Sequence, residues 1–519
     1  MPLKRLYKME TDKKREDELI SRTDLRLLAR AKECWDFLKD FRRERERCKN
    51  FTYGDQWNDF IEDRGVRMRE CDYIVSQGNM PLKNNLIRRL VRNVLGVYRN
   101  RWKMPRCERI GSEDGGEIVV VNSMLEYISD INRLEEVYAR TMEEFLISGL
   151  AVHKKWYGRR NGNCDCQTDL ISPSRFFFDR CSSDFRGFDV SIVGEIHEMG
   201  VNDLVATFAR NPREAETVRT VYGLPPSGHT DVFCAVYEVW ERHRPMMLRC
   251  HDRRDGSLYT LGDTDEKKIV AENMRRRLKG EKRLIETVWT TEEEWHYAFL
   301  TPDGHVLREG RSPYPDGSHP YIIKAYPYID GEIHSFVSDI IDQQKLTNRL
   351  ISMYDWILRA SAKGVLLFPE GSLPDGVDIN EIADEWGRFN GVIVYRPRAG
   401  VPLPQQVSSK SADIGITELL EIQMKMMEDI SGVNGALQGK LESNSMSGTL
   451  YNQQTQNSLT ALADLLRSFD DFVMQATHAD VANMLRFYTR DVIRDITGES
   501  VGNGFNQLNA KNVLKLTNQ

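Results

Sequence analysis

One glycine-rich segment of the sequence has residue types that could bind a phosphate group. Gly435-Ala-Leu-Gln-Gly-Lys440 places a lysine directly after a glycine, as the loops that hold nucleotide phosphates do. Its spacing differs from theirs, and Leu441 stands where such a loop needs a Ser or Thr hydroxyl to bind magnesium. The segment therefore does not predict a nucleotide site.

Two other segments offer metal ligands or catalytic groups. Cys164-Asp-Cys166, with His153 and Cys181, could bind zinc, although free thiols in a hairpin are the simpler interpretation. Glu292-Glu-Glu294 could supply carboxylates, but a charged turn before a strand explains it. The sequence has no His-Glu-x-x-His, Gly-x-Ser-x-Gly or Cys-x-x-Cys motif. We therefore predict that the protein is not an enzyme and has no cofactor and no metal.

Length and composition narrow the class of protein. A chain of 519 residues exceeds what one hydrophobic core usually holds, so we expect two or more subdomains. The net charge of −6 excludes a polycation, whereas nucleic-acid-binding domains tend to be basic. No apolar run approaches the roughly 18 residues of a membrane span, and the basic N-terminus lacks an apolar signal region. The nine scattered cysteines are typical of reduced thiols in a cytoplasmic compartment.

The middle of the chain, from about Phe336 to Arg494, has the most regular pattern. A first helix is predicted from Ser338 to Gly364, because apolar residues recur at helical spacing and glycine is a typical stop. From there to about Val407, short β-rich runs such as 365–368 and 392–395 are separated by Pro and Gly.

Another helix, a loop and a long rod follow this insert. The second helix is predicted at about 411–430, with a bend at Gly415. Gly432–Gly448 is too rich in Gly, Ser and Asn to hold one conformation alone. The helical pattern then continues without Gly or Pro from about 449 to 496, which at ~1.5 Å per residue is roughly 70 Å. Such a rod suits a large assembly.

The first 335 residues combine helices with strands, so the predicted fold class is α+β. Helices are expected at about 19–48, after Pro81 and at about 118–148. Candidate strands are 150–157, 174–178, 190–198, 232–242, 283–290, 295–300 and 321–326. The helix after Pro81 is rich in arginine, and the run Arg275–Arg283 is also basic. A solvated or inter-subunit face is the simpler interpretation of both, with phosphate contact as the alternative.

Short motifs spread over most of the chain occur in one consistent order. They are Gly54-Asp-Gln-Trp57, Asn84-Asn85, Ile147-Ser-Gly149, Ile171-Ser-Pro173 followed by Asp179, Tyr237-Glu-Val-Trp240, His319-Pro-Tyr321, Tyr326–Gly331, Asp342-Gln-Gln-Lys-Leu-Thr-Asn348, Ile430-Ser-Gly-Val-Asn434 and Ser447-Gly448. In this order the chain resembles the portal proteins of tailed bacteriophages.

The resemblance implies a portal-like layout. Its parts would be a wing (1–335), a first stem helix (336–363), a clip (364–409), a second stem helix (410–432), a tunnel loop (433–448), a long wing helix (449–496), and a short tail or rudimentary crown (497–519).

The resemblance also implies which residues carry the function. The tunnel loop facing DNA would include Gly435, Gln438, Lys440, Asn444, Ser445 and Ser447. The channel face of the first stem helix would present Asp342, Lys345, Arg349, Asp355 and Arg359. The clip would dock the motor and adaptors through Glu370, Asp375, Asp378, Arg388, Arg396 and Arg398. Because DNA must slide, mixed charge and a single loop lysine would give weak, non-specific electrostatic contact.

Portal proteins form rings, and the resemblance implies one of about twelve subunits at one capsid vertex of the virion, assembled in the host cytoplasm. Double-stranded DNA would be packaged and ejected through it. Expected partners are the terminase large subunit, the major capsid and scaffolding proteins, and a head–tail adaptor or tail proteins, with no membrane. Two alternatives remain. A subunit of a nucleic-acid-processing enzyme requires a metal or nucleotide site, and a cytoplasmic coiled-coil scaffold predicts a dimer through the long helix.

Overall fold

The computed structural model is a mixed α+β structure, as predicted. It divides into two compact units: unit 1 (1–49, 91–338 and 441–519) and unit 2 (50–90 and 339–440). The described residues are 22–109, 116–160, 162–180, 182–225, 232–262, 265–314, 317–363, 365–369, 373, 376–387, 392–397, 400, 402–407, 415–435, 437, 448–498 and 514–517. Among them, no helix is both long enough and apolar enough to cross a bilayer.

Unit 1 is built around an antiparallel five-stranded sheet in the order β13–β12–β8–β7–β6. Its strands are β6 (Phe176–Phe178), β7 (Ile192–Gly200), β8 (Phe233–His243), β12 (Glu294–Leu300) and β13 (Val306–Arg311). Trp240 on β8 is completely buried, and the rings of Tyr297 and Tyr314 lie 5.3 Å and 5.8 Å from it. This aromatic centre joins the apolar residues of the sheet into one core.

Short helices cover this sheet. They are α2 (Leu25–Phe37), α8 (Val201–Phe208) and α9 (Pro212–Val221). Asp24 caps α2 by accepting a hydrogen bond from the Leu27 N–H at 3.0 Å, which satisfies one of the free donors at a helix start. Leu28, Leu204 and Val218 from these helices are buried in the core of the sheet.

A second sheet of unit 1, in the order β14–β4–β5, packs against longer helices. Its strands are β4 (Leu150–Arg160), β5 (Asn163–Leu170) and β14 (Tyr321–Ala325), and the helices are α6 (Gly116–Asn132), α7 (Leu134–Ser148) and α15 (Ala463–Phe487). The short helix α16 (Arg490–Thr497) packs against α6. Lys155 on β4 and Asp480 on α15 form a buried ion pair at 2.6 Å. Elsewhere on α15, the ring of Phe469 lies 5.5 Å from the ring of Phe145 on α7.

The remaining elements of unit 1 are smaller or peripheral. One group is a three-stranded sheet of β9 (Met246–Asp252), β10 (Leu258–Gly262) and β11 (Ile285–Thr291), with α10 (Glu266–Leu278) packed on it. The others are β3 (Arg106–Arg109), β15 (Tyr328–Ile329), β16 (Glu332–Ile333), α14 (Gly448–Ala461) and β19 (Leu514–Thr517). Three elements have residues in both units: α3 (Lys39–Tyr53), α5 (Leu86–Arg101) and the 3₁₀ turn η3 (Ser338–Ile340).

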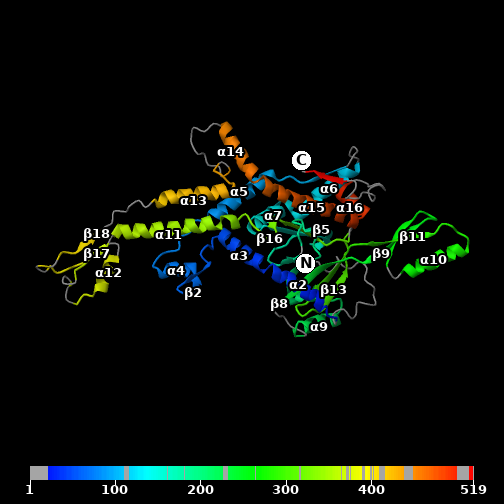
Figure 1. Cartoon of the computed structure of the whole chain (residues 1–519), viewed down its shortest axis with the longest axis horizontal. Helices are drawn as coiled ribbons and strands as arrows, with labels where there is room; N and C mark the ends of the chain where they lie inside the picture. Colours follow the sequence, from blue (N-terminus) through cyan, green and yellow to red (C-terminus); the bar gives the residue numbers. More distant parts are fainter. Residues whose placement is uncertain are drawn as a thin grey trace. The chain divides into compact units, whose positions relative to one another are not determined.

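Unit 2 consists of paired helices and two small β-hairpin-like elements. Its elements are β1 (Phe60–Asp63), β2 (Val66–Arg69), α4 (Glu70–Ser76), α11 (Ile341–Lys363), β17 (Val365–Leu367), α12 (Ile379–Gly387), β18 (Gln405–Val407) and α13 (Ile416–Ser431). β17 pairs with β18 and β1 with β2, both antiparallel. In Figure 1, α11 and α13 run side by side, and the group of β17, α12 and β18 lies at one end of this pair.

Most predicted elements are present, but the prediction of one uninterrupted rod at 449–496 is wrong. The segment forms α14, α15 and α16, with breaks at Leu462 and at Tyr488–Thr489. Tyr488 is extended because its hydroxyl accepts a hydrogen bond from the Cys166 N–H at 3.2 Å, and Thr489 then caps α16.

Three further predictions are also corrected by the structure. The helix predicted at 118–148 is divided at Arg133, whose φ is +50°. Residues 392–395 form no strand, and β18 pairs with β17 instead. Helix α12 was not predicted, because its short apolar pattern lies among Pro and Gly residues.

Candidate functional site

The paired helices α11 and α13 are the described elements that correspond to the predicted channel. They are antiparallel, since the chain leaves α11, passes through β17, α12 and β18, and returns along α13 (Figure 1). α11 begins at Ile341, directly after the turn that Ser338 opens, as the sequence pattern predicts. It carries the predicted channel-face residues Asp342, Lys345, Arg349, Asp355 and Arg359.

Two of the predicted channel-face cations have carboxylate partners inside unit 2. Lys345 Nζ lies 2.6 Å from Asp59 Oδ2 and 3.7 Å from Glu70 Oε2. Arg349 Nη2 lies 2.6 Å from Glu70 Oε1. Asp342 is exposed and Asp355 is half-buried, while the side chain of Arg359 lies outside the described residues. The described part of this face therefore carries little uncompensated positive charge.

Next to these ion pairs, α11 carries two buried amides. Gln344 and Asn348 are completely buried. Asn348 Nδ2 donates to Gln56 Oε1 at 2.7 Å, and its Oδ1 accepts from the Asn84 N–H at 3.1 Å. Gln344 Nε2 donates to the Asn84 carbonyl at 2.7 Å and to Asn348 Oδ1 at 2.9 Å. Every contact satisfies a polar group that would be costly to bury alone.

Gln344 also caps helix α5. The first N–H groups of a helix have no acceptor within the helix. Gln344 Oε1 accepts from the N–H groups of Leu86 at 2.9 Å and Ile87 at 3.3 Å. Asn85 completes the cap by accepting from the Arg88 N–H at 3.0 Å. We name Gln56, Asn84, Asn85, Gln344 and Asn348 the polar junction. Three of the motifs that carry the resemblance thus meet in one hydrogen-bonded cluster.

Helix α13 has a buried side and, next to it, a half-exposed apolar one. The buried side faces into unit 2 through Ile416, Gln423 and Met427. The other is a stripe of four apolar side chains, each between 41% and 48% exposed: Leu419, Ile422, Met426 and Ile430. Their spacing of three to four residues puts them on one line of the helix. We name these four residues the α13 stripe.

The chain leaves α13 through a tight glycine cap. Gly432 has a φ of +68°, a left-handed conformation that glycine adopts without strain. Val433 beyond it is completely buried, and Asn434 Oδ1 accepts from the Leu437 N–H at 3.2 Å. Gly435 is also buried. The other predicted tunnel-loop residues lie outside the described residues: Gln438, Lys440, Asn444, Ser445 and Ser447.

Few of the predicted clip residues are described. Asp378 begins α12 by accepting from the Ile379 N–H at 2.7 Å and from Asn380 Nδ2 at 2.8 Å, so it acts as a helix cap. Arg396 is exposed. Glu370, Asp375, Arg388 and Arg398 lie outside the described residues.

Three of the five arginines of α5, Arg88, Arg89 and Arg99, have partners in the protein. Arg89 lies 3.8 Å from Glu428 of α13, and Arg99 lies 2.9 Å from Glu136 of α7. The Arg88 guanidinium stacks over the ring of Tyr53 at 4.8 Å. These contacts favour the interpretation of this helix as a structural face, and not as a phosphate-binding surface.

A buried charge cluster lies on the main sheet of unit 1, within the motif Tyr237-Glu-Val-Trp240. Glu238 is completely buried, and its Oε2 accepts from Lys154 Nζ at 2.5 Å and lies 2.7 Å from His197 Nε2. Ligand atoms of Glu195, His197 and Glu238 lie within 4.8 Å of one another. The Lys154 ammonium already supplies the positive charge that a metal ion would bring. The cluster is therefore structural.

The segments that could do chemistry have structural explanations. Cys164 and Cys166 are free thiols on β5 of the β4–β5 hairpin, as expected, while Cys181 lies outside the described residues. Glu292–Glu294 connects β11 to β12, which confirms a charged turn before a strand.

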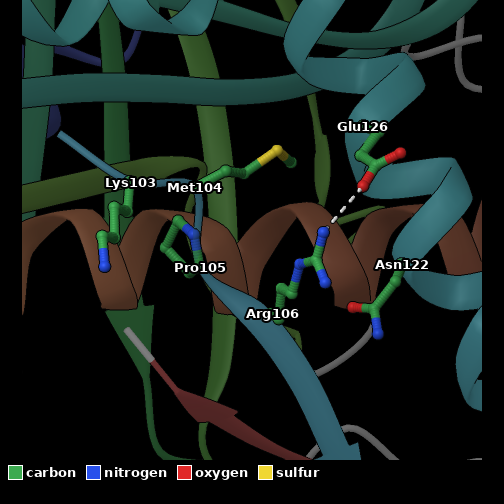
Figure 2. A pocket seen from close by; sticks show the side chains of 6 residues that line it. All are labelled: Lys103, Met104, Pro105, Arg106, Asn122 and Glu126. Carbon is green, nitrogen blue, oxygen red and sulfur yellow. Dashed lines mark hydrogen bonds and ion pairs between the residues drawn. The ribbon is translucent and has the colours of Figure 1, made fainter. Parts of the chain in front are cut away.

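One surface hollow in unit 1, shown in Figure 2, is lined by Lys103, Met104, Pro105, Arg106, Asn122 and Glu126. Its polar groups bind within the protein. Arg106 pairs with Glu126 at 3.5 Å, and both side chains are more than half exposed. The Asn122 amide exchanges hydrogen bonds with the backbone of Cys107 at 2.8 Å and 3.1 Å. These hydrogen bonds hold β3 against α6. The residues that line the hollow include no nucleophile paired with a base.

Sequence reasoning missed Glu70 and Asp59 as partners of the α11 cations. Arg349 and Glu70 are 279 residues apart, and a local pattern cannot show such a pairing. A signal existed for the polar junction, because its residues fall within motifs that we had singled out.

Two comparisons with known proteins test the resemblance to portal proteins. A search among curated proteins finds no significant match. The family model described as phage P22-like portal protein matches residues 28–519, nearly the whole chain. The match spans both units and includes α11, α13 and the polar junction. The chain therefore belongs to the P22-like phage portal protein family.

Proposed function

We propose that this protein is the subunit of a ring-shaped portal at one capsid vertex, through which double-stranded DNA is packaged and ejected. Its family is a structural component of the phage head. The observation that supports the proposal is the α13 stripe, because four half-exposed apolar side chains in one line offer a neighbouring chain a continuous surface to bury.

A neighbouring copy of the chain is the partner that this stripe suits. Contacts between two different patches of identical subunits close into a ring when the rotation between them closes. Each of the four side chains of the stripe is about half exposed, so its burial stabilises the contact by about 1 kcal/mol and the stripe by roughly 4 kcal/mol per subunit. Repeated around a ring of about twelve subunits, such contacts would hold the stem together.

The layout that we propose follows the chain. Residues 336–363 and 410–432 are the two stem helices, 364–409 the clip, 433–448 the tunnel loop and 449–496 the helical wing segment. Residues 1–335 form the rest of the wing, and 497–519 a short tail or rudimentary crown. The antiparallel pairing of α11 and α13 around the insert of β17, α12 and β18 supports this assignment.

The charges of α11 suit a channel in which DNA slides. Lys345 and Arg349 are held by Asp59 and Glu70, so they contribute little net positive potential. Binding to DNA phosphates strengthens with the number of uncompensated cations, and a channel lined by free lysines would retain its cargo. We propose that Lys440 supplies the weak contact, with Gln438, Asn444, Ser445 and Ser447 as its polar surroundings.

The clip is the part of the subunit to which we propose that other proteins dock. The terminase large subunit and later a head–tail adaptor would bind the clip, through Glu370, Asp375, Asp378, Arg388, Arg396 and Arg398. Capsid and scaffolding proteins would surround the ring. Assembly would take place in the host cytoplasm.

The test is the mass and symmetry of the purified protein, measured by native mass spectrometry and negative-stain imaging. We expect a ring of about twelve subunits with a central hole. The double variant Ile422→Asp and Met426→Asp should yield monomers. The control exchanges charges on the exposed polar side of α13, with Glu421→Lys and Lys425→Glu, and should keep the ring. A wild-type protein that forms a stable dimer would contradict the proposal.

A further inference from the structure

A hollow of about 660 Å³ lies on unit 1 between α15 and the strands β14 and β15. Its apolar lining is unusually open to water: Phe185 is 42% exposed and Ile329 is 61% exposed. Its volume is within the range of ligand-binding pockets and is large enough for a few side chains of a bound peptide. An apolar hollow with exposed aromatic and aliphatic walls is a typical docking surface.

The rim of this hollow is acidic. Asp464, Asp470 and Asp471 lie along α15 on one side of it. Two cations also line the hollow, Lys324 and Arg467. Lys324 is completely buried and its Nζ lies 3.4 Å from Asp471 Oδ2, while Asp471 is itself 69% exposed. Lys324 is thus part of the wall, and Arg467 is the one exposed cation among the residues lining the hollow. The nearby Arg186 guanidinium, 5.5 Å from the centroid of the Phe185 ring, pairs with Asp184 at 3.0 Å.

The chain has a segment outside the described residues whose composition complements this hollow. Residues 1–9 read Met-Pro-Leu-Lys-Arg-Leu-Tyr-Lys-Met, with three cations, several large apolar side chains and no acid. The family match begins at residue 28, so this segment is additional to it. The described chain begins at Arg22, whose carbonyl accepts from the Val306 N–H of β13 at 2.9 Å. The residues between Met9 and Arg22 can span about 40 Å when extended.

We propose that the basic, apolar segment Met1–Met9 docks in this hollow, with Leu3, Leu6 or Tyr7 against Phe185 and Ile329, and with its lysines and arginine beside the rim carboxylates. The apolar side chains provide the affinity, as buried anchors in a pocket do. The opposite charges fix the orientation and make the contact sensitive to salt. The inference does not depend on ring formation.

The test is a directed disulfide in the full-length protein. Leu6→Cys is combined with Ile329→Cys, in a background where the two described cysteines that are not buried are removed by Cys71→Ser and Cys164→Ser. The matched control combines Leu6→Cys with Leu278→Cys on α10, because Leu278 is 90% exposed and so more accessible than Ile329. Mild oxidation is followed by peptide mapping with mass spectrometry.

We expect the disulfide between positions 6 and 329 to form at least about tenfold faster than the disulfide between positions 6 and 278, as proximity raises the effective concentration. Asp464→Lys, or Lys4→Glu with Arg5→Glu, should slow it several-fold. Disulfide-linked dimers would place the segment in the hollow of a neighbouring subunit, and linked monomers in its own. Equal rates at positions 329 and 278, or no effect of the charge reversals, would overturn the inference.

Discussion

The buried cluster around Glu238 makes a quantitative prediction about stability. Glu238→Gln keeps the size of the side chain but removes the negative charge that faces Lys154 at 2.5 Å. The Lys154 side chain is only 5% exposed, so its ammonium would stay buried without that counter-charge. Its other neighbours are the ring of Tyr321, 5.4 Å away, and the carboxyl of Glu195, whose pKa is raised by burial. A cation–π contact offsets only part of the lost ion pair, and a carboxyl with a raised pKa is a weaker counter-charge than Glu238. Breaking a buried ion pair at one side costs about 3–5 kcal/mol.

The pH dependence of this cluster follows from the pKa of Glu238. Burial alone would raise this pKa, but the Lys154 ammonium and the hydrogen bond with His197 outweigh burial and hold it well below its ordinary value. A depressed carboxyl pKa stabilises the folded state above the pKa of the unfolded chain, near 4.3 for Glu, and this stabilisation is lost as the pH falls. The stability difference between wild type and Glu238→Gln should therefore be constant above about pH 5.5 and shrink below about pH 4.

The assay is urea unfolding followed by tryptophan fluorescence, since Trp240 Nε1 donates to Glu238 Oε1 at 2.9 Å and reports on the cluster. The control is Glu198→Gln on the neighbouring strand β7, where the side chain is 60% exposed and the change should cost less than about 0.5 kcal/mol. Lys154→Met combined with Glu238→Leu should recover at least about 2 kcal/mol relative to Glu238→Gln. A cost below about 1 kcal/mol for Glu238→Gln would refute the reasoning.

Two further substitutions test the packing of each unit. Gly149→Ala should destabilise unit 1 by about 3 kcal/mol or more, because φ is +75° at this residue and a Cβ would lie 1.7 Å from the His334 carbonyl oxygen. Hydrogen exchange of the amides of α7 and β14 would measure this loss of stability. Unchanged protection of those amides would contradict the prediction. Asn348→Ala should cost about 2–4 kcal/mol, because it removes the donor to Gln56 Oε1 and the acceptor of the Asn84 N–H in the polar junction. Local exchange at the start of α5 should rise, and Ser361→Ala on α11, outside the junction, should leave that exchange unchanged.

Local sequence patterns predicted much of the fold. The first stem helix was expected at 338–363, and α11 covers Ile341–Lys363 after a 3₁₀ turn. The end of the helix before Gly149 was also correct, since Gly149 caps α7 in a left-handed conformation. Such features depend on neighbours within about four residues, through apolar periodicity and glycine caps.

The candidate site was less predictable, for a physical reason. A local pattern shows that Lys345 and Arg349 lie on the polar side of a helix, but not that Asp59 and Glu70 neutralise them. The spacing of a lysine or arginine along a helix is the same whether its charge is free in solvent or paired with a distant carboxylate. The α13 stripe was not predicted from the sequence, since exposure depends on which elements pack on the helix.

The sequence by itself determined the α+β class, the pair of helices around an insert, the absence of a catalytic motif and the order of motifs that the family match bears out. Only the tertiary structure decided which of those motif residues meet, as Gln344 does when it caps α5. It also decided that the predicted rod breaks at Tyr488, whose hydroxyl binds the Cys166 N–H. Helix periodicity is a property of nearby residues, whereas caps, ion pairs and helix breaks of this kind require atoms brought together from distant parts of the chain.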